Sequence, residues 1–119
     1  MSKRDSLLLL SDMLESAQKI SRYTRQLDYE AFLKDERTID AVVRNFEIIG
    51  EAANRLGQDF RNSHPEYEWN RIRGLRNRIV HEYFGIDYRI VWTIIESYLD
   101  DLIESLSSII DTFGTSPDN

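Results

Sequence analysis

The sequence predicts an all-α fold, an antiparallel up-and-down bundle of four helices. Apolar residues recur at three- and four-residue steps over four long stretches, which is the pattern of helices with one buried face. The 119 residues include only five glycines and two prolines, so the chain has few residues that favour turns. We expect a single helical domain over residues 1–113 and a flexible tail over residues 114–119.

The first two predicted helices cover residues 5–27 and 37–56, with a connection at 28–36 that contains one short helical turn. Their apolar stripes contain Leu7, Leu10, Leu14, Ala17, Ile20, Tyr23 and Leu27 in the first helix and Ile39, Val42, Val43, Phe46, Ile49, Ala53 and Leu56 in the second. Gly50 lies in mid-helix, where glycine costs roughly 1 kcal/mol relative to alanine. Such a glycine indicates a close contact with a neighbouring helix.

The last two predicted helices cover residues 69–83 and 88–112, after an irregular segment at 57–68. Pro65 disfavours helical geometry at His64, which is therefore expected as an exposed loop residue. Phe84 and Gly85 are expected to end the third helix, and Asp87 to cap the fourth. The buried stripes contain Ile72, Leu75, Ile79 and Val80, and then Val91, Ile94, Ile95, Tyr98, Leu99, Leu102, Ile103, Leu106, Ile109 and Ile110. Trp69 and Trp92 adjoin these stripes and are expected in the core.

The charge distribution limits the possible partners. The net charge is −6, which argues against broad, nonspecific adhesion to nucleic acid. However, residues 71–89 carry five arginines against two acids, whereas residues 96–119 carry six acids and no base. The arginine-rich segment can hold a phosphate locally and the acidic part suits a basic partner surface, although solvated helix faces explain such charges equally well.

Metal, cofactor and membrane functions find no support in the sequence. There is no cysteine, there are two histidines, and no metal-binding spacing is present, so we expect no metal and no cofactor. Acidic residues interrupt the N-terminal leucines too early for a signal peptide or a membrane span. A cytoplasmic location is the default expectation.

One segment of the third predicted helix combines residues that suit phosphodiester chemistry. The predicted helix continues to residue 83, so Arg76 and Tyr83 lie at the margin of its buried stripe, and Asn77 and His81 share a neighbouring, more exposed strip. The four polar residues are therefore contiguous along one side of the helix. RNA carries its own nucleophile in the 2′-hydroxyl group, so a protein needs only proton transfer and positive charge at the phosphate. Imidazole titrates near neutral pH, at about 6.5, and guanidinium matches phosphate oxygens.

These residues therefore receive candidate roles. His81 is the candidate for proton transfer, Arg76 for the scissile phosphate, Asn77 for positioning, and Arg73 and Tyr83 for substrate binding. Purely structural roles remain open at this point. In that interpretation, His81 caps the bundle surface, Arg76 pairs with an acid such as Glu51, and Tyr83 packs at the helix end.

The string RNRIVHEYFGID resembles the signature of the HEPN superfamily of metal-independent ribonucleases, and specifically of the HepT toxins. That motif is an arginine, four residues, a histidine, one residue and a tyrosine, which Arg76, His81 and Tyr83 match in register. Asn77 matches the polar residue that commonly follows the arginine. The resemblance extends to IGEAANRL, to the approach through Pro65 and Trp69, and to FGIDYRIVW, so it covers most of the chain.

The resemblance implies a HEPN-like bundle that acts as the toxin of a toxin–antitoxin system. It implies a homodimer in which the two motif segments form a composite cleft that cleaves RNA, such as tRNA or mRNA. It further implies a cognate MntA-type nucleotidyltransferase antitoxin that transfers AMP to Tyr83. The alternative is a noncatalytic helical dimer that binds the nucleotidyltransferase. Glu51 either orients a motif residue or pairs with an arginine.

Overall fold

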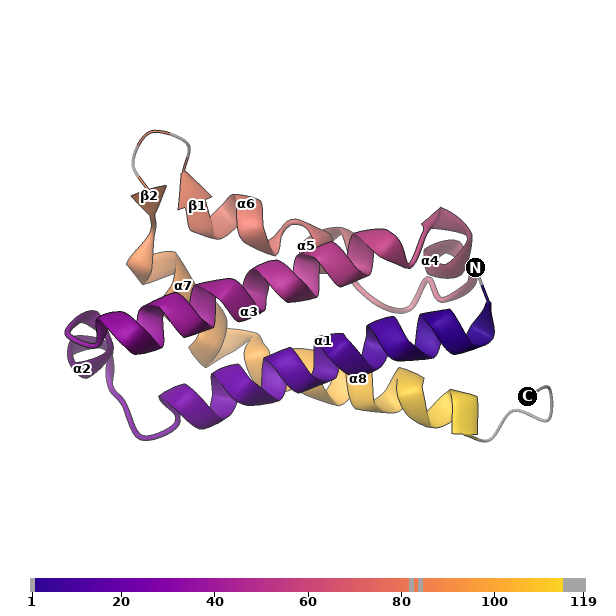
Figure 1. Cartoon of the computed structure of the whole chain (residues 1–119), viewed down its shortest axis with the longest axis horizontal. Helices are drawn as coiled ribbons and strands as arrows, with labels where there is room; N and C mark the ends of the chain where they lie inside the picture. Colours follow the sequence, from indigo (N-terminus) through magenta and orange to yellow (C-terminus); the bar gives the residue numbers. More distant parts are fainter. Residues whose placement is uncertain (1, 82, 84, 115–119) are drawn as a thin grey trace.

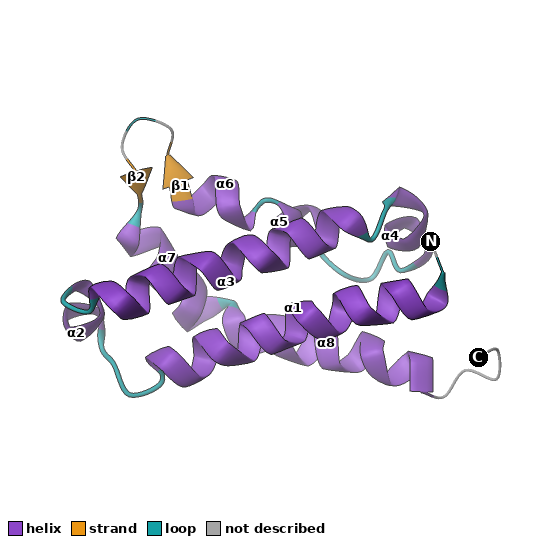
Figure 2. Cartoon of the chain, viewed as in Figure 1, coloured by secondary structure: helices purple, strands orange, loops and turns teal. Residues whose placement is uncertain are grey.

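Four long helical segments run alternately up and down in the computed structural model, which describes residues 2–81, 83 and 85–114 (Figure 1). Helices account for most of these residues, and a two-stranded hairpin lies at one end (Figure 2). The bounds are α1 (Lys3–Thr24), α2 (Tyr29–Leu33), α3 (Glu36–Arg55), α4 (Gln58–Ser63), α5 (Trp69–Arg73), α6 (Leu75–Ile79), β1 (Val80–His81), β2 (Gly85–Ile86), α7 (Tyr88–Ser97) and α8 (Leu99–Gly114). The predicted all-α class is confirmed.

Short polar side chains fix the starts of four helices. Ser2 and Asp5 form a reciprocal capping box at the start of α1. Asp28, Asp35 and Asp87 each accept a hydrogen bond from the backbone N–H three residues later, at the starts of α2, α3 and α7. These bonds satisfy N–H groups that have no partner within the helix. The predicted cap at Asp87 and the predicted helical turn within residues 28–36 are confirmed.

The core lies where α1 packs between α3 and α8, and α3 also packs against α5 and α6. Both tryptophans are buried, as expected. Tyr23 is an exception to the predicted stripe of α1, because its side chain is exposed. Thr24 is buried at the same end of the helix and donates its hydroxyl proton to the carbonyl oxygen of Ile20 at 2.8 Å.

Gly50 lies where α3 meets the end of α5. A β-carbon at this position would lie 3.4 Å from the carbonyl oxygen of Arg73 and 3.7 Å from that of Ile72. The close helix contact predicted from this glycine is confirmed. It fixes the distance between α3 and the segment that carries the candidate site.

The third predicted helix ends four residues early, at Ile79, and Gly74 separates it into α5 and α6. Val80 adopts extended dihedral angles, and Gly85 has a φ of 75°, which favours glycine. Val80 pairs with Ile86 and His81 pairs with Gly85 in an antiparallel hairpin. This hairpin replaces the last turn of the predicted helix; Phe84, expected at its end, lies outside the described residues.

The fourth predicted helix bends at Tyr98, which separates α7 from α8. The dihedral angles of Tyr98 leave the helical region, while its ring lies 3.7 Å from the guanidinium carbon of Arg71. The bend directs α7 toward α6 and α8 toward α1. Of the predicted tail, Gly114 is the last residue of α8 and residues 115–119 lie outside the described part of the chain. No helix among the described residues has the length and apolarity needed to cross a membrane.

Candidate active site

His81 lies on β1 with its imidazole beside the carboxylate of Asp87. Nε2 of His81 is 3.3 Å from Oδ2 of Asp87, and 45% of the histidine side chain remains exposed. The other carboxylate oxygen, Oδ1, accepts the hydrogen bond from Ile90 N–H at 3.0 Å. The backbone N–H of Asp87 donates to the carbonyl oxygen of Ile79 at 2.8 Å. Asp87 is therefore held at both its backbone and its side chain, and it contacts an accessible imidazole.

Arg76 and Asn77 lie on α6, immediately before the hairpin, and both are exposed. The carbonyl oxygen of Arg76 accepts the N–H of Val80, which joins the end of α6 to β1. Within the described part of the chain, the Arg76 side chain forms no ion pair or hydrogen bond, and Glu51 forms no ion pair either. The structural alternative of an Arg76–Glu51 pair is thus not formed, and the guanidinium is available to an anion.

Tyr83 lies in the turn of the hairpin, and 87% of it is exposed. The helical geometry predicted for the motif is wrong beyond Ile79, because His81 and Tyr83 follow the end of the helix. His81 therefore does not share a helical strip with Asn77, and Tyr83 is not at the margin of the buried stripe. The physical consequence is a more accessible phenol than a helix end would give.

Arg73 lies on α5, on the other side of Gly74 from Arg76. Its Nε donates to Oδ1 of Asn54 at 2.7 Å, and its Nη1 donates to Oδ1 of Asn70 at 3.4 Å. These bonds tie the guanidinium to the end of α3. The side chain therefore lines a separate surface hollow together with Arg61 and Arg71.

Asp87 is a candidate site residue that was predicted from the sequence only as a helix cap. The signal was present in the spacing, since His81 and Asp87 flank a segment that contains Gly85. Gly85 is followed by the β-branched Ile86, and a glycine permits the turn of a hairpin, which brings its two ends together. Recognising the histidine–aspartate pair required recognising the hairpin first.

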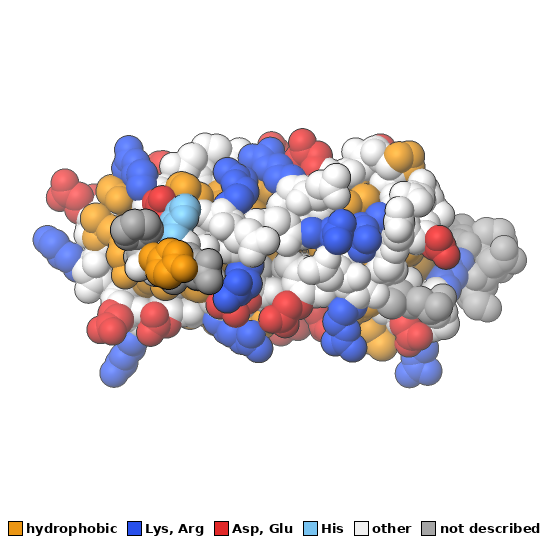
Figure 3. Space-filling view, turned by 90° about the horizontal axis from the view of Figure 1, so that it is seen from above, with side chains coloured by type: hydrophobic (Ala, Val, Ile, Leu, Met, Phe, Trp, Pro, Cys, Tyr) orange, Lys and Arg blue, Asp and Glu red, His pale blue; other side chains and the backbone are white. Residues whose placement is uncertain are grey.

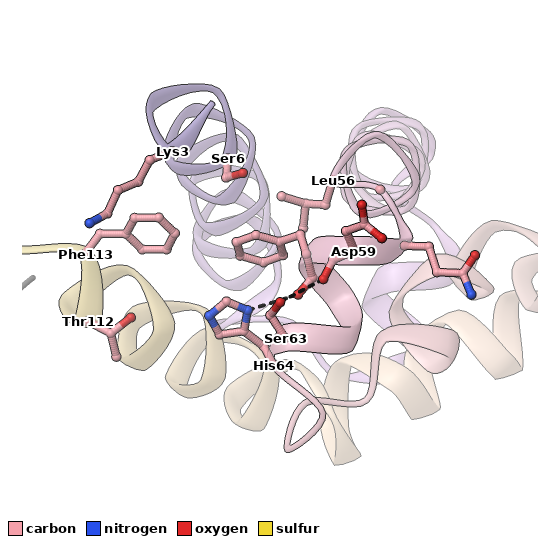
Figure 4. A pocket seen from close by; sticks show the side chains of 11 residues that line it. Lys3, Ser6, Leu56, Asp59, Ser63, His64, Thr112 and Phe113 are labelled. Carbon is pink, nitrogen blue, oxygen red and sulfur yellow. Dashed lines mark hydrogen bonds between the residues drawn. The ribbon is translucent and has the colours of Figure 1, made fainter. Parts of the chain in front are cut away.

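A different hollow, of about 720 Å³, opens at the end of the bundle opposite the hairpin, where α4 meets the ends of α1 and α8 (Figure 4). It contains His64, which was expected as an exposed loop residue but is half-buried at the end of α4. The imidazole stacks on Phe60 with ring centroids 4.4 Å apart, and Nδ1 lies 3.0 Å from the Phe60 carbonyl oxygen. His64 therefore packs locally, and its carbonyl oxygen accepts from Trp69 Nε1.

The hairpin end of the molecule thus combines a guanidinium, an imidazole–carboxylate pair and an exposed phenol. An imidazole can transfer protons, an aspartate can orient it, and an arginine can stabilise negative charge on a phosphate. Among the described residues, no three histidine, aspartate or glutamate side chains are grouped to hold a metal ion.

Comparisons with known proteins agree on one family. The family model described as "Ribonuclease HepT-like" matches residues 13–109. "Putative RNase MJ1380" of Methanocaldococcus jannaschii is 44% identical over 96 residues, covering 81% of this chain and 88% of the relative. "Putative RNase MJ0127" of the same organism is 38% identical over 110 residues, covering 92% and 91%. "Probable ribonuclease HepT" of Thermococcus cleftensis is 37% identical over 100 residues, covering 84% and 91%. No solved structure matches.

Proposed function

The chain belongs to the HepT-like ribonuclease family, and on that premise we propose that it is the toxin of a toxin–antitoxin pair, an endoribonuclease that cleaves RNA without a metal ion. One observation carries the proposal. The accessible imidazole of His81 rests against Asp87, directly after the helix that exposes Arg76 and Asn77.

The proposed reaction uses the nucleophile that RNA already contains. The 2′-hydroxyl oxygen attacks the adjacent phosphorus and the bond to the 5′-oxygen breaks, which leaves a 2′,3′-cyclic phosphate and a 5′-hydroxyl group. An imidazole accepts the proton of the attacking hydroxyl, and an acid returns a proton to the leaving oxygen. His81 performs the proton transfer, Arg76 neutralises the added charge on the phosphate, and Asn77 positions it.

A homodimer completes the site in this proposal. Each chain contributes one His81, whereas the reaction needs one group to accept a proton and one to donate it. Two motif segments that face each other across a composite cleft supply both groups. The exposed Tyr83 in the hairpin turn and the exposed Tyr88 just after the hairpin support an interface at this end, because exposed aromatic side chains favour association.

The same geometry suggests how the toxin is neutralised. A cognate MntA-type nucleotidyltransferase transfers AMP from ATP to Tyr83: the phenol oxygen attacks the α-phosphate and pyrophosphate leaves. The 87% exposure of Tyr83 at the hairpin turn supports access by such an enzyme. The product carries a negative phosphate and a bulky nucleoside two residues from His81, where both would obstruct an RNA phosphate.

The decisive experiment incubates the purified protein with RNA in EDTA and analyses the ends of the fragments. We expect 2′,3′-cyclic phosphate ends from the wild type and none from His81→Ala. His64→Ala is the matched control, because it removes the other histidine at the far end of the bundle and should leave cleavage unchanged. Circular dichroism verifies that each variant is folded.

Full cleavage by pure, folded His81→Ala would refute the assignment. If the wild type does not cut RNA but binds a nucleotidyltransferase tightly, the noncatalytic dimer module is the better description.

A further inference from the structure

A concave surface formed by α4, α5 and the loop between them gathers positive charge. This hollow, the arginine pocket, is defined by Arg61, Arg71 and Arg73 and has a volume of about 720 Å³. Amide side chains of α4 and α5 and the ring of Tyr67 line it as well. Its arginines come from two segments that Pro65 and the surrounding loop bring together.

Arg61 is held in the pocket by the end of α3. Its Nη1 donates to the carbonyl oxygens of Ala53 at 3.1 Å and Asn54 at 3.4 Å. These are carbonyl groups of the last turn of a helix, where a cation is favourable. Both guanidinium groups bond to the same residue, Arg61 to the carbonyl oxygen of Asn54 and Arg73 to its Oδ1. Burial, and then the charge of Arg73, lower the pKa of Arg61.

Neutral atoms also hold Arg73, through the side-chain oxygens of Asn54 and Asn70. Arg71 differs, since its Nη1 lies 3.5 Å from a carboxylate oxygen of Glu68 and its guanidinium stacks on Tyr98. Among the described residues that line the pocket, three arginines face one carboxylate, an excess of two positive charges. The fold therefore holds two like charges against one residue, Asn54, and none of the described residues bonded to these two arginines is acidic.

We propose that the arginine pocket binds a backbone phosphate of the RNA strand, outside the bond that is cleaved. Arginine offers paired N–H donors that match phosphate oxygens, and the amide side chains of Asn62 and Asn70 add neutral donors. Because Arg61 and Arg73 are already anchored, little side-chain freedom is lost when the phosphate binds. The inference rests on the proposed ribonuclease function for the identity of its ligand.

The surrounding charges determine where the strand can run. On the other side of Tyr67, Asp101 and Glu104 line a separate acidic hollow, which repels a polyanion. The face that carries α5 and α6 has basic side chains over its middle and acidic ones mainly toward its edges (Figure 3). Arg73 of the pocket and Arg76 of the candidate site lie on consecutive short helices, α5 and α6, which Gly74 separates. A strand that follows this face can therefore place one phosphate at Arg76 and another in the pocket.

The test measures binding of a labelled single-stranded 2′-O-methyl RNA oligonucleotide, which lacks the attacking hydroxyl and cannot be cleaved. Fluorescence anisotropy gives the affinity of the full-length protein over a series of salt concentrations. We expect Arg61→Gln and Arg73→Gln each to weaken binding and to reduce the slope of log K against log salt by about 0.7. Arg61→Lys should retain most of the slope, because it keeps the charge.

Arg44→Gln is the matched control, since it removes an exposed arginine of α3 whose near partner is Glu47. It should keep the wild-type slope. Unchanged affinity and slope in folded Arg61→Gln and Arg73→Gln would overturn the proposal and favour an acidic protein surface as ligand. A competition arm adds inorganic phosphate at matched ionic strength. Displacement of the oligonucleotide by phosphate well beyond that by chloride would indicate a free-anion site and would also overturn it.

Cleavage of unmodified RNA by the wild type separates this inference from the proposed function. If binding depends on the arginines but no cleavage occurs, the ribonuclease function fails and the phosphate site stands. If cleavage occurs and the arginines do not affect binding, only the phosphate site fails.

Discussion

The carboxylate of Asp87 joins the imidazole of His81 to the first turn of α7. One oxygen lies 3.3 Å from Nε2 of His81, and the other accepts the N–H of Ile90 at 3.0 Å. The helix cap thus fixes the carboxylate, and the carboxylate restricts the imidazole. The first turn of α7 thus limits, through Asp87, the movement of a histidine that lies on a short hairpin.

Asp87→Asn should therefore reduce RNA cleavage without unfolding α7. Asparagine caps a helix about as well as aspartate, so the bond to Ile90 can persist, while the negative charge beside His81 is lost. We expect kcat to fall about ten-fold or more, equivalent to about 1.4 kcal/mol or more in the activation barrier, with little change in KM. Initial rates on a defined RNA measure both constants.

Asp35→Asn provides the control for this variant. Asp35 caps α3 in the same way as Asp87 caps α7, but it contacts no histidine. Its substitution should leave kcat unchanged. Equal rates for Asp87→Asn and the wild type would mean that Asp87 serves only as a cap.

Arg76→Lys tests whether the shape of the cation matters in addition to its charge. Lysine keeps the positive charge but lacks the planar fork that contacts two phosphate oxygens. We expect Arg76→Ala to be inactive and Arg76→Lys to cleave at a rate between that of Arg76→Ala and that of the wild type. Arg78→Lys, also an exposed residue of α6, should cleave normally. An Arg76→Lys variant with the wild-type kcat would show that a point charge suffices.

Local periodicity predicted the long helices, because each needs one apolar stripe to pack against the bundle. Gly50 and Asp87 were also interpreted correctly, since a mid-helix glycine and a capping aspartate act through their immediate neighbours. The hairpin was missed for the opposite reason. A run such as Ile79–Val80 suits a last helical turn as well as a strand. The strand forms because Gly85 adopts a positive φ and the chain returns to pair Ile86 with Val80.

Arg76, His81 and Tyr83 were predictable as residues of the candidate site, but the partner Asp87 and the geometry were not. The spacing of Arg76, His81 and Tyr83 is visible in the sequence, yet the angles between them assumed a continuous helix. The arginine pocket was not predictable at all. Arg61 and Arg73 are twelve residues apart across an irregular segment, and no local pattern indicates that their side chains meet.

Under the proposed mode of neutralisation, co-expression with a cognate nucleotidyltransferase should add one adenylyl group to Tyr83. Intact-mass measurement detects the addition, and the modified protein should have lost RNA cleavage. Tyr83→Phe lacks the acceptor oxygen and should stay unmodified, whereas Tyr88→Phe, which removes another exposed tyrosine, should be modified normally. Adenylylation of Tyr83→Phe to the wild-type extent would place the acceptor elsewhere.

The ionised side chain of Asp35 should make the free energy of unfolding vary with pH in the acidic range. Hydrogen bonds from the hydroxyl group and then from the backbone of Thr38 lower the pKa of Asp35 below its usual value. Because the folded-state pKa is the lower one, the stabilisation is present above the usual carboxyl value, about 4, and is lost as pH falls through the folded-state pKa. Asp35→Ala should be less stable than the wild type at pH 7, and the difference should shrink in strong acid.

Urea unfolding at a series of pH values measures this effect. Asp40→Ala removes an exposed acid from the same helix and should show a smaller difference that varies little with pH. A difference between Asp35→Ala and the wild type that is constant from pH 7 to strong acid would contradict the role of the ionised cap.

Gly50 should link the packing of α3 against α5 to the rate of cleavage at the candidate active site. A β-carbon here would lie 3.4 Å from the carbonyl oxygen of Arg73, which is an ordinary contact, so Gly50→Ala should stay within about 1 kcal/mol of the wild type. The larger Gly50→Val should lose about 1–3 kcal/mol of unfolding free energy, because its methyl groups would clash with the backbone of α5.

Since the chain continues from α5 through Gly74 into α6, the displacement of α5 should also move Arg76. Gly50→Val should therefore cleave RNA more slowly even at a temperature where unfolding curves show it fully folded, whereas Gly50→Ala should not. Equal stability and activity of the two variants would mean that the contact between α3 and α5 accommodates the valine side chain and does not set the position of the site.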